Sequence, residues 1–243
     1  MPEGPSIIIA KEEADIFEGH NVLTASGNAK IDMARIEGKK LIAIKTWGKH
    51  LLLCFDGFTL RVHFLLFGTY RINERKKTSK LRLGLTFANG ELNIYTAAVK
   101  VLEGDVNDHY KWSEDVMGDA WDANAAFEKF KDMPDKMICD TLLEQDVFSG
   151  VGNIIKNEVL YRVYVHPESK TGSIPAEKQH ELIAEARNYS FDFLRWKKEY
   201  VLKKHWLAHS KKTCLRCNLP LIKEYTGVKK RRSFFCTNCQ VLY

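Results

Sequence analysis

The spacing of hydrophobic residues changes twice along the chain. Residues 5–17 place Ile9, Ile16 and Phe17 on one face at helical spacing, and Gly19 follows as a stop signal. From about residue 21 to 103, hydrophobic and polar positions alternate instead, which predicts β-strands. The expected strands cover 41–45, 51–55, 59–64, 68–72, 81–87 and 92–94, with a hairpin turn at Asn89-Gly90. Short strands in close succession indicate a sandwich or a barrel.

After residue 105 the spacing becomes helical. Asp122 is a suitable N-cap for a helix over 123–131, and further helices are expected over 140–148, 153–163 and 176–198. Residues 195–206 read as a continuing helix and strand. We place boundaries near residues 122 and 207, which divides the chain into 1–122, 123–206 and 207–243. The expected fold class is α+β.

Composition narrows the class of protein. Hydrophobic residues make up 45% of the 243 positions and charged residues 28%, enough to bury a core. No apolar run approaches the roughly 18 to 20 residues of a membrane span, and the start of the chain lacks the apolar core of a signal peptide. We therefore expect no membrane contact and a cytoplasmic location, at the nucleoid in a bacterium.

Basic residues concentrate in the last fifth of the chain. The net charge is +6, yet from Arg195 onward there are 13 Lys and Arg against 2 Asp and Glu. This asymmetry favours a polyanion as partner. A solvated basic tail is the alternative, but the same segment holds aromatic residues at 196, 200, 206, 225, 234 and 235, too many for a disordered tail.

Four of the six cysteines form two pairs near the C-terminus. The pairs Cys214/Cys217 and Cys236/Cys239 are 18 residues apart, a length that suits a β-hairpin between them. Four thiolates in this pattern predict one closed, structural zinc site with no catalytic position. Residues 229–232 read Lys-Lys-Arg-Arg and are expected at the hairpin tip, where they can bind phosphate. Such a zinc ribbon also occurs in transcription and ribosomal proteins.

The two remaining cysteines, Cys54 and Cys139, are isolated in the sequence. In a cytosolic chain we interpret both as small buried hydrophobic residues without a redox role.

A glycine-rich elbow joins two of the predicted helices. It reads Ser149-Gly150-Val151-Gly152-Asn153, and Asn153 can cap the helix that follows. The first N–H groups of that helix would then form an anion site. Plain turn chemistry is the alternative for this elbow taken alone.

The N-terminus carries candidate chemistry. Removal of Met1 would leave Pro2 with a free secondary amine, which is partly neutral near cellular pH. A neutral amine is a nucleophile that can form an iminium, and Glu3 beside it could transfer protons. A proline-rich, frayed start is the alternative.

Three segments together resemble the formamidopyrimidine-DNA glycosylase / endonuclease VIII family. They are MPEGP at the start, LLEQDVFSGVGNIIKNEVLYRVYVHPES at 142–169, and CLRC…KKRRSFFCTNCQ at the end. The resemblance implies an N-terminal β-sandwich with flanking helices, a helix–two-turn–helix domain and a C-terminal β-hairpin zinc finger. It also implies a bifunctional enzyme of base excision repair, which excises an oxidised base and then cuts the strand. The implied partner is double-stranded DNA with damaged bases or abasic sites, bound by a monomer in the cleft between the lobes.

The resemblance assigns chemical roles to four residues. Pro2 would attack the sugar C1′, Glu3 would protonate the ring oxygen, and Lys49 would hold a phosphate near the lesion. The iminium intermediate would then undergo β- and δ-elimination. Arg231 matches the zinc-finger arginine, with Arg232 as a close competitor.

The remaining matches concern DNA binding. Asn153 matches a phosphate-binding asparagine, and Glu158 matches a glutamate that helps arrange the site. Leu65, Leu66 and Phe67 would fill the void left by a flipped nucleotide, although this run could also be a core strand.

Ser6 stands where family members commonly carry an acidic residue, a departure that either alters the proton chemistry or is tolerated. Two other features bear on the substrate: the start reads MPEGP, where the purine-specific enzymes resemble each other in MPELP, and no glycine occurs from Asn188 to Thr213, where those enzymes have a glycine-containing loop. We therefore expect an endonuclease VIII-type enzyme that favours oxidised pyrimidines. The alternatives are an oxidised-purine glycosylase of the same family, a non-catalytic binder of damaged DNA on this scaffold, and a zinc-ribbon protein without a repair function.

Overall fold

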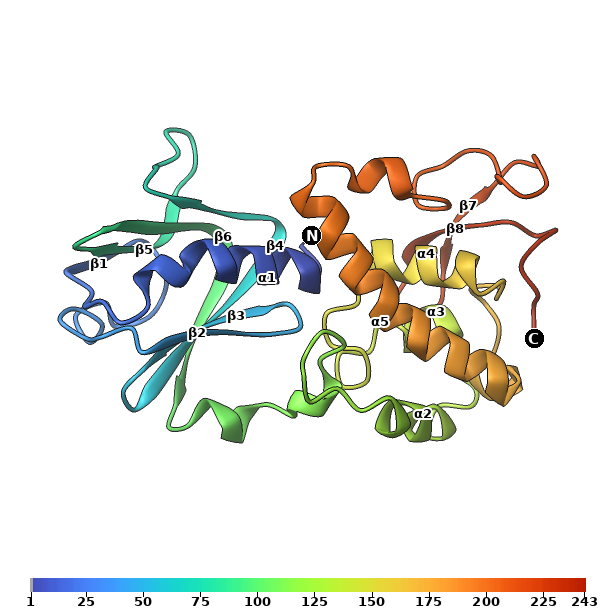
Figure 1. Ribbon diagram of the computed structural model, residues 1–243, viewed down its shortest axis with the longest axis horizontal. Coiled ribbons are helices and arrows are strands. Elements are labelled where there is room, and N and C mark those ends of the chain that lie inside the picture. The colour runs from blue at the N-terminus through green and yellow to red at the C-terminus, as the bar shows by residue number, and fades with distance from the viewer. Residues whose placement is uncertain (1) are drawn as a thin grey trace. The chain divides into compact units, whose positions relative to one another are not determined.

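The computed structural model describes residues 2–243 and contains two compact units, Met1–Lys111 and Trp112–Tyr243 (Figure 1). Unit 1 holds the N-terminal helix and the large sheet, whereas unit 2 holds the other α-helices and the four-cysteine hairpin. The expected removal of Met1 concerns a residue outside the described part of the chain. The division into 1–122, 123–206 and 207–243 stays a prediction.

Unit 1 is built on one antiparallel sheet of six strands in the order β1-β5-β6-β4-β3-β2. Helix α1 (Gly4–Ala14), continued by a 3-10 turn at Asp15–Phe17, packs against β2, β3 and β4. The strands are β1 (Thr24–Ser26), β2 (Ala43–Trp47), β3 (His50–Phe55), β4 (Phe58–Ile72), β5 (Leu81–Phe87) and β6 (Gly90–Glu103).

The sheet bends within its two longest strands. Residues 59–64 and 68–72 were expected as separate strands but form the single β4, whose register shifts between Phe64 and Thr69. A Cβ on Gly68 would lie 2.8 Å from the Thr96 carbonyl oxygen, so a glycine lets the strands approach there. Thr96 itself has φ +52. The bend is therefore built into both β4 and β6.

One hydrophobic core lies between the two halves of this bent sheet. It joins side chains of β3 and the first part of β4, such as Leu53 and Leu60, with side chains of β5 and β6, such as Leu85 and Ile94. Phe17 beside α1 completes it. The predicted N-terminal β-sandwich is thus confirmed, with its two halves formed by one sheet whose continuous strands pass from one half to the other.

Unit 2 contains four α-helices and a two-stranded hairpin. The helices are α2 (Ala123–Lys131), α3 (Ile138–Thr141), α4 (Asn153–Arg162) and α5 (Ala176–Lys198), and the hairpin strands are β7 (Ile222–Thr226) and β8 (Arg231–Phe235). Asp122 caps α2 as expected, since its side chain accepts from the Asn124 and Ala125 N–H groups. The predicted α+β class is confirmed. Within the described residues, no helix has the length and apolar character of a membrane span.

Two predicted elements of unit 2 are wrong. The helix expected over 140–148 ends at Thr141, because the Gln145 amide bonds the Leu143 and Val151 carbonyls and the Gly150 N–H, which stabilises turns instead. The helix and strand expected over 195–206 are a helix end at Lys198 and a 3-10 turn at Leu202–His205.

Candidate functional site: a metal centre and a basic hairpin

The four predicted metal ligands lie together. The sulfur atoms of Cys214, Cys217, Cys236 and Cys239 are all within 4.8 Å of one another, which is the spacing that four thiolates around one ion require. Cys54 and Cys139 are buried elsewhere, as expected, and burial raises the pKa of both thiols. The four-cysteine cluster can therefore hold a single metal ion.

Helix α4 supplies a second layer to this cluster. The Tyr161 hydroxyl lies 3.1 Å from the Cys214 sulfur and is buried. Burial opposes ionisation of Cys214, but this hydroxyl and nearby backbone N–H groups lower its pKa to about 6. Arg216, between the first two cysteines, donates to the Tyr161 carbonyl at 2.8 Å and covers the Tyr164 ring at 3.5 Å. These contacts fix the metal cluster to the C-terminal end of α4.

Three side chains of α4 converge on one carbonyl of the hairpin. The Arg232 carbonyl oxygen accepts from Asn153 Nδ2 at 2.9 Å, Asn157 Nδ2 at 3.2 Å and Lys156 Nζ at 3.3 Å. The expected capping role of Asn153 is wrong: Gly152 is the N-cap, and no side chain caps the helix. Lys156 is fully buried and also donates to Ser233 Oγ at 2.7 Å. Strand β8 is thereby held against α4.

A buried carboxylate holds the turn of the hairpin. Asp140 accepts from the backbone N–H groups of Val228 at 2.6 Å and Lys229 at 3.2 Å. Gly227 has φ +71, and a Cβ there would lie 2.4 Å from Asp140 Oδ2, so the turn needs a glycine. Only part of the Lys-Lys-Arg-Arg run is at the tip, because Arg231 begins β8.

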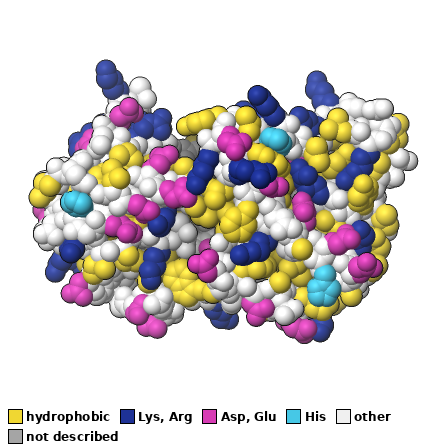
Figure 2. Space-filling model, in the orientation of Figure 1, with side chains coloured by type: hydrophobic (Ala, Val, Ile, Leu, Met, Phe, Trp, Pro, Cys, Tyr) yellow, Lys and Arg dark blue, Asp and Glu magenta, His cyan; other side chains and the backbone are white. Residues whose placement is uncertain are grey.

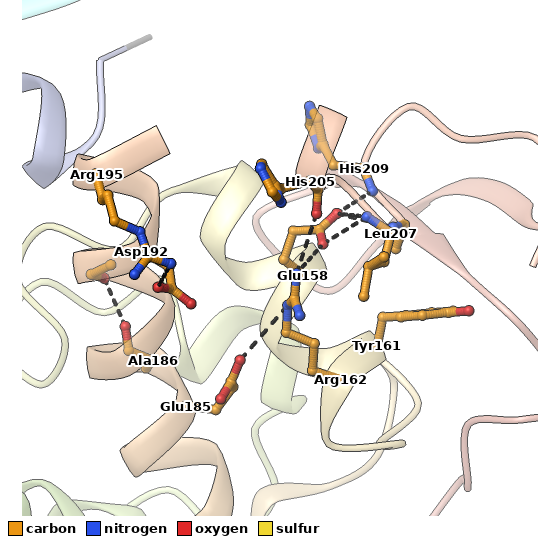
Figure 3. A network of polar contacts seen from close by, with 12 residues as sticks. Glu158, Tyr161, Arg162, Glu185, Ala186, Asp192, Arg195, His205, Leu207 and His209 are labelled. Atoms are coloured by element: carbon orange, nitrogen blue, oxygen red, sulfur yellow. Dashed lines mark hydrogen bonds and ion pairs between the residues drawn. The ribbon is translucent and has the colours of Figure 1, made fainter. Parts of the chain in front are cut away.

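Glu158 organises the segment that leads into the cysteines. Its carboxylate is fully buried and accepts from the backbone N–H groups of Leu207, Ala208 and His209 at 2.8–3.1 Å (Figure 3). Arg162 lies 3.5 Å from the same carboxylate. Glu158 thus acts on the segment 207–209, and its expected part in DNA binding stays a prediction.

The two candidate arginines of the hairpin differ in their contacts. Both are exposed. Arg232 donates to the Tyr225 hydroxyl at 2.8 Å, whereas Arg231 has no side-chain partner among residues 2–243. Arg231 is therefore the freer of the two to meet an external anion. Figure 2 shows several Lys and Arg side chains on the face of unit 2 in view.

The remaining predicted residues belong to unit 1. Pro2 is partly exposed and Glu3, the N-cap residue of α1, is 3% exposed. Lys49 occupies the two-residue turn between β2 and β3, where Trp47 pairs with His50. Figure 1 shows the start of α1 and the turn between β2 and β3 at the same end of unit 1. Unit 1 thus carries Pro2, Glu3 and Lys49, and their expected chemical roles stay predictions.

The residues Leu65, Leu66 and Phe67 lie at the irregularity of β4. They are 44%, 58% and 80% exposed, so the alternative of a core strand is wrong for these side chains. His63 pairs with His50 across β3 and β4, which places the Lys49 turn next to the start of this exposed run. The run is an apolar protrusion open to a partner.

No pattern in the sequence indicated a part-buried cluster of aromatic side chains next to the Lys49 turn. The Tyr110 hydroxyl lies 3.3 Å from His50 Nδ1, and the His50 and His63 rings meet edge to face at 5.4 Å. Burial, with Arg61, His63 and Lys49 nearby, lowers the pKa of His50 to about 3. Lys156, Asn157 and Asp140 were also missed, because polar residues of these types are usually exposed.

Comparisons with known proteins agree with this arrangement. The family model of the Formamidopyrimidine-DNA glycosylase H2TH domain matches residues 114–189. Endonuclease 8-like 3 of Xenopus laevis is 27% identical over 231 residues, which cover 90% of this chain and 38% of that protein. Formamidopyrimidine-DNA glycosylase of Lactobacillus helveticus (strain DPC 4571) is 27% identical over 283 residues, with 100% of both chains covered.

The fold has a solved counterpart in Lactococcus lactis formamidopyrimidine-DNA glycosylase bound to DNA with an AP site. Its TM-score is 0.86 at 22% identity, and the match covers 98% of this chain and 99% of that one. A viral DNA glycosylase matches with a TM-score of 0.83. The chain spans about two fifths of the length of the endonuclease 8-like 3 relatives. Residues 114–189 thus carry the helical domain of the formamidopyrimidine-DNA glycosylases, and with its terminal motifs and four-cysteine hairpin the whole chain is similar to the formamidopyrimidine-DNA glycosylase / endonuclease VIII family.

Proposed function

We propose that this protein is a DNA glycosylase with AP lyase activity, using Pro2 as its nucleophile. The observation that carries the proposal is the Pro2-Glu3 pair at the start of α1, where Glu3 is 3% exposed. A carboxyl group shielded from water beside a secondary amine suits proton transfer during covalent catalysis. A protein that only binds damaged DNA has no need of this pair.

The proposed reaction begins when the free Pro2 amine attacks C1′ of the damaged nucleotide. A bond forms between the nitrogen and C1′ as the bond from C1′ to the base breaks, and the proton lost by the amine neutralises the departing base. Glu3 then gives a proton to the ring oxygen as the bond from C1′ to that oxygen breaks, which opens the sugar and leaves an iminium between C1′ and the nitrogen. The resulting iminium makes the C2′ proton acidic, so that first the 3′ and then the 5′ phosphate leaves. Water finally releases the sugar fragment and restores the amine.

Unit 2 supplies the proposed phosphate contacts. Arg231 is exposed on a strand that α4 and Asp140 hold at several points, so its guanidinium is displayed from a fixed backbone. We propose zinc as the metal of the four-cysteine cluster, because a closed set of thiolates selects it. The metal would be structural, holding the two ends of the finger together.

We further propose a preference for oxidised pyrimidines, in a protein that works as a monomer. The segment between α5 and Cys214 contains a 3-10 turn at Leu202–His205 and no glycine, unlike the flexible loop expected of a purine-specific enzyme. A pyrimidine with weakened stacking is also easier to extrude. Single-turnover excision should be faster on thymine glycol and dihydrouracil than on oxidised guanine paired with cytosine, and the reverse order would overturn this preference.

Borohydride trapping on DNA with an abasic site tests the central proposal. The protein should form a covalent complex, and mass spectrometry of its N-terminus should show that Met1 is absent. A variant with extra residues before Pro2 should not be trapped, and equal trapping would mean that Pro2 is not the nucleophile.

The role of Glu3 requires a separate comparison. Glu3→Gln should lose base excision more severely than cutting at a preformed abasic site, because base loss places the greatest demand on proton donation. Glu12→Gln, at an exposed position of the same helix, is the matched control and should keep both activities. Equal losses in both assays for Glu3→Gln would contradict this division of roles.

A further inference from the structure

Helix α5 ends in a motif that normally contains glycine. The Tyr200 N–H bonds the Lys197 carbonyl at 3.1 Å, and the Val201 N–H bonds the Trp196 carbonyl at 2.9 Å. These two bonds define a Schellman motif, in which the residue after the C-cap adopts a left-handed backbone. That residue is Tyr200, with φ +59. An aromatic side chain thus occupies a position where its Cβ costs energy.

Nothing inside the protein compensates for this strain. The Tyr200 side chain is 96% exposed, and no residue in the described part of the chain bonds to it or stacks on it. Tyr164 is the informative comparison, since it also has a positive φ, of +64, but its ring is covered by Arg216 at 3.5 Å. A strained residue with a ring held wholly in solvent indicates an external partner.

The ring stands on a rigid and basic support. Trp196 of α5 and His205 of the following 3-10 turn stack at 4.1 Å with an interplanar angle of 3°, which braces the loop between them. Residues 195–204 contain five basic side chains and one acidic side chain: Arg195, Lys197, Lys198, Lys203 and Lys204 against Glu199. An exposed aromatic ring among cations is the arrangement that proteins use to stack an unpaired nucleobase while holding its phosphates.

We propose that Tyr200 is a stacking platform for an unpaired base of the bound DNA strand, with Lys203 and Lys204 beside it contacting the backbone. This inference rests on the proposed function, because DNA is the polyanion that function brings to unit 2. The platform would favour DNA whose bases are accessible, next to a lesion or in a single strand. Tyr225, also exposed, is different because Arg232 already bonds its hydroxyl.

The test compares two strands of equal charge. Fluorescence anisotropy would measure binding of a 15-nucleotide thymidine strand and of a strand of the same length built from base-free tetrahydrofuran residues. The parent protein should bind the thymidine strand about tenfold more tightly. Tyr200→Gly should abolish that difference, and Tyr200→Phe should keep it, since the ring and not the hydroxyl does the stacking.

Three further measurements separate stacking from other effects. Tyr200→Gly should melt no lower than the parent, because glycine relieves the backbone strain. The slope of log affinity against log salt concentration should be the same for Tyr200→Gly as for the parent. Lys203→Gln should lower that slope by about 0.7 for single strands. Ser210→Gly, at an exposed position with φ +60, relieves strain without removing a ring and should bind as the parent does.

Three results would overturn the inference, and the first two are equal affinity of the parent for both strands and equal losses on both strands in Tyr200→Gly. An unchanged affinity of Tyr200→Gly would also overturn it and would indicate a protein partner instead. The outcome is independent of the borohydride assay. If trapping fails while the base-dependent affinity is lost in Tyr200→Gly, the platform stands and the proposed chemistry falls.

Discussion

Replacing Glu158 by glutamine should destabilise unit 2 and weaken DNA binding. The three N–H groups of residues 207–209 all reach Oε1 of Glu158, and Leu207 also reaches Oε2. In Glu158→Gln an amide oxygen could still accept these three bonds, but without a negative charge. In addition, the new NH2 group would point toward the Leu207 N–H and toward Arg162.

The size of the effect follows from these contacts. A hydrogen bond to a charged group contributes about 1.5–3 kcal/mol and a neutral one about 0.5–1.5, so each of the three bonds should lose about 1 kcal/mol. The free energy of unfolding should therefore fall by about 3 kcal/mol. At roughly 2–4 °C per kcal/mol for a domain of this size, the melting temperature should drop by about 6–12 °C.

Differential scanning calorimetry and anisotropy with undamaged duplex would measure the two effects together. Glu185→Gln is the matched control, because Glu185 is a single partner of the same Arg162 at 3.7 Å and should cost less than about 1 kcal/mol. DNA affinity should fall in Glu158→Gln because the segment 207–209 leads directly into the first cysteine pair. A melting temperature within about 2 °C of the parent would refute the reasoning.

Further predictions concern the metal cluster, the hairpin and pH. Tyr161→Phe removes the hydroxyl beside Cys214 and should speed loss of the bound metal to a chelator by about 10–100-fold, whereas Tyr164→Phe, which has no such contact, should not; equal rates would exclude a role for the hydroxyl. Gly227→Ala forces a Cβ against Asp140 and should lower both the melting temperature and DNA affinity with the metal content unchanged; parent-like melting and binding would show that the turn adapts. His50 has its pKa lowered to about 3, so between about pH 6.5 and 3 the unfolded chain binds a proton that the folded chain does not. The contribution of His50 to the free energy of unfolding is therefore complete above about pH 6.5 and falls by about 2 kcal/mol from pH 7 to 5. Urea unfolding of His50→Asn should give a free energy of unfolding that changes correspondingly less over this pH range. A pH dependence equal to that of the parent would contradict the prediction.

Much of the local structure could be predicted from residue patterns. The period-two alternation located β5 and the start of β6, and the spacing of apolar residues located α5 at 176–198. Asp122 was identified as an N-cap because its side chain satisfies N–H groups two and three residues ahead, a purely local interaction. The metal-binding pattern of the cysteine pairs could also be predicted, since the spacing of ligands in the chain reflects tetrahedral geometry.

The errors arose where a side chain bonds backbone groups other than those that a regular helix would offer it. Asn153 has the side chain of a helix cap, yet its amide donates to Arg232, 79 residues away. The helix expected after Asp140 was wrong because Gln145 bonds the backbone of residues up to Val151. Local propensity is a weak prior where a tertiary hydrogen bond offers a better partner.

The sequence by itself determined the bounds of α2, α5 and β5, the four candidate thiolate ligands and the candidate nucleophile, because each depends on neighbouring residues or fixed spacings. Only the tertiary structure decided which polar residues are buried and what they hold. Lys156 looks like a surface residue in the sequence, and its burial against the Arg232 carbonyl exists only because α4 packs on β8. The strain and exposure of Tyr200 likewise depend on how α5 ends. Burial is a property of the whole fold, since water is excluded by residues that are remote along the chain.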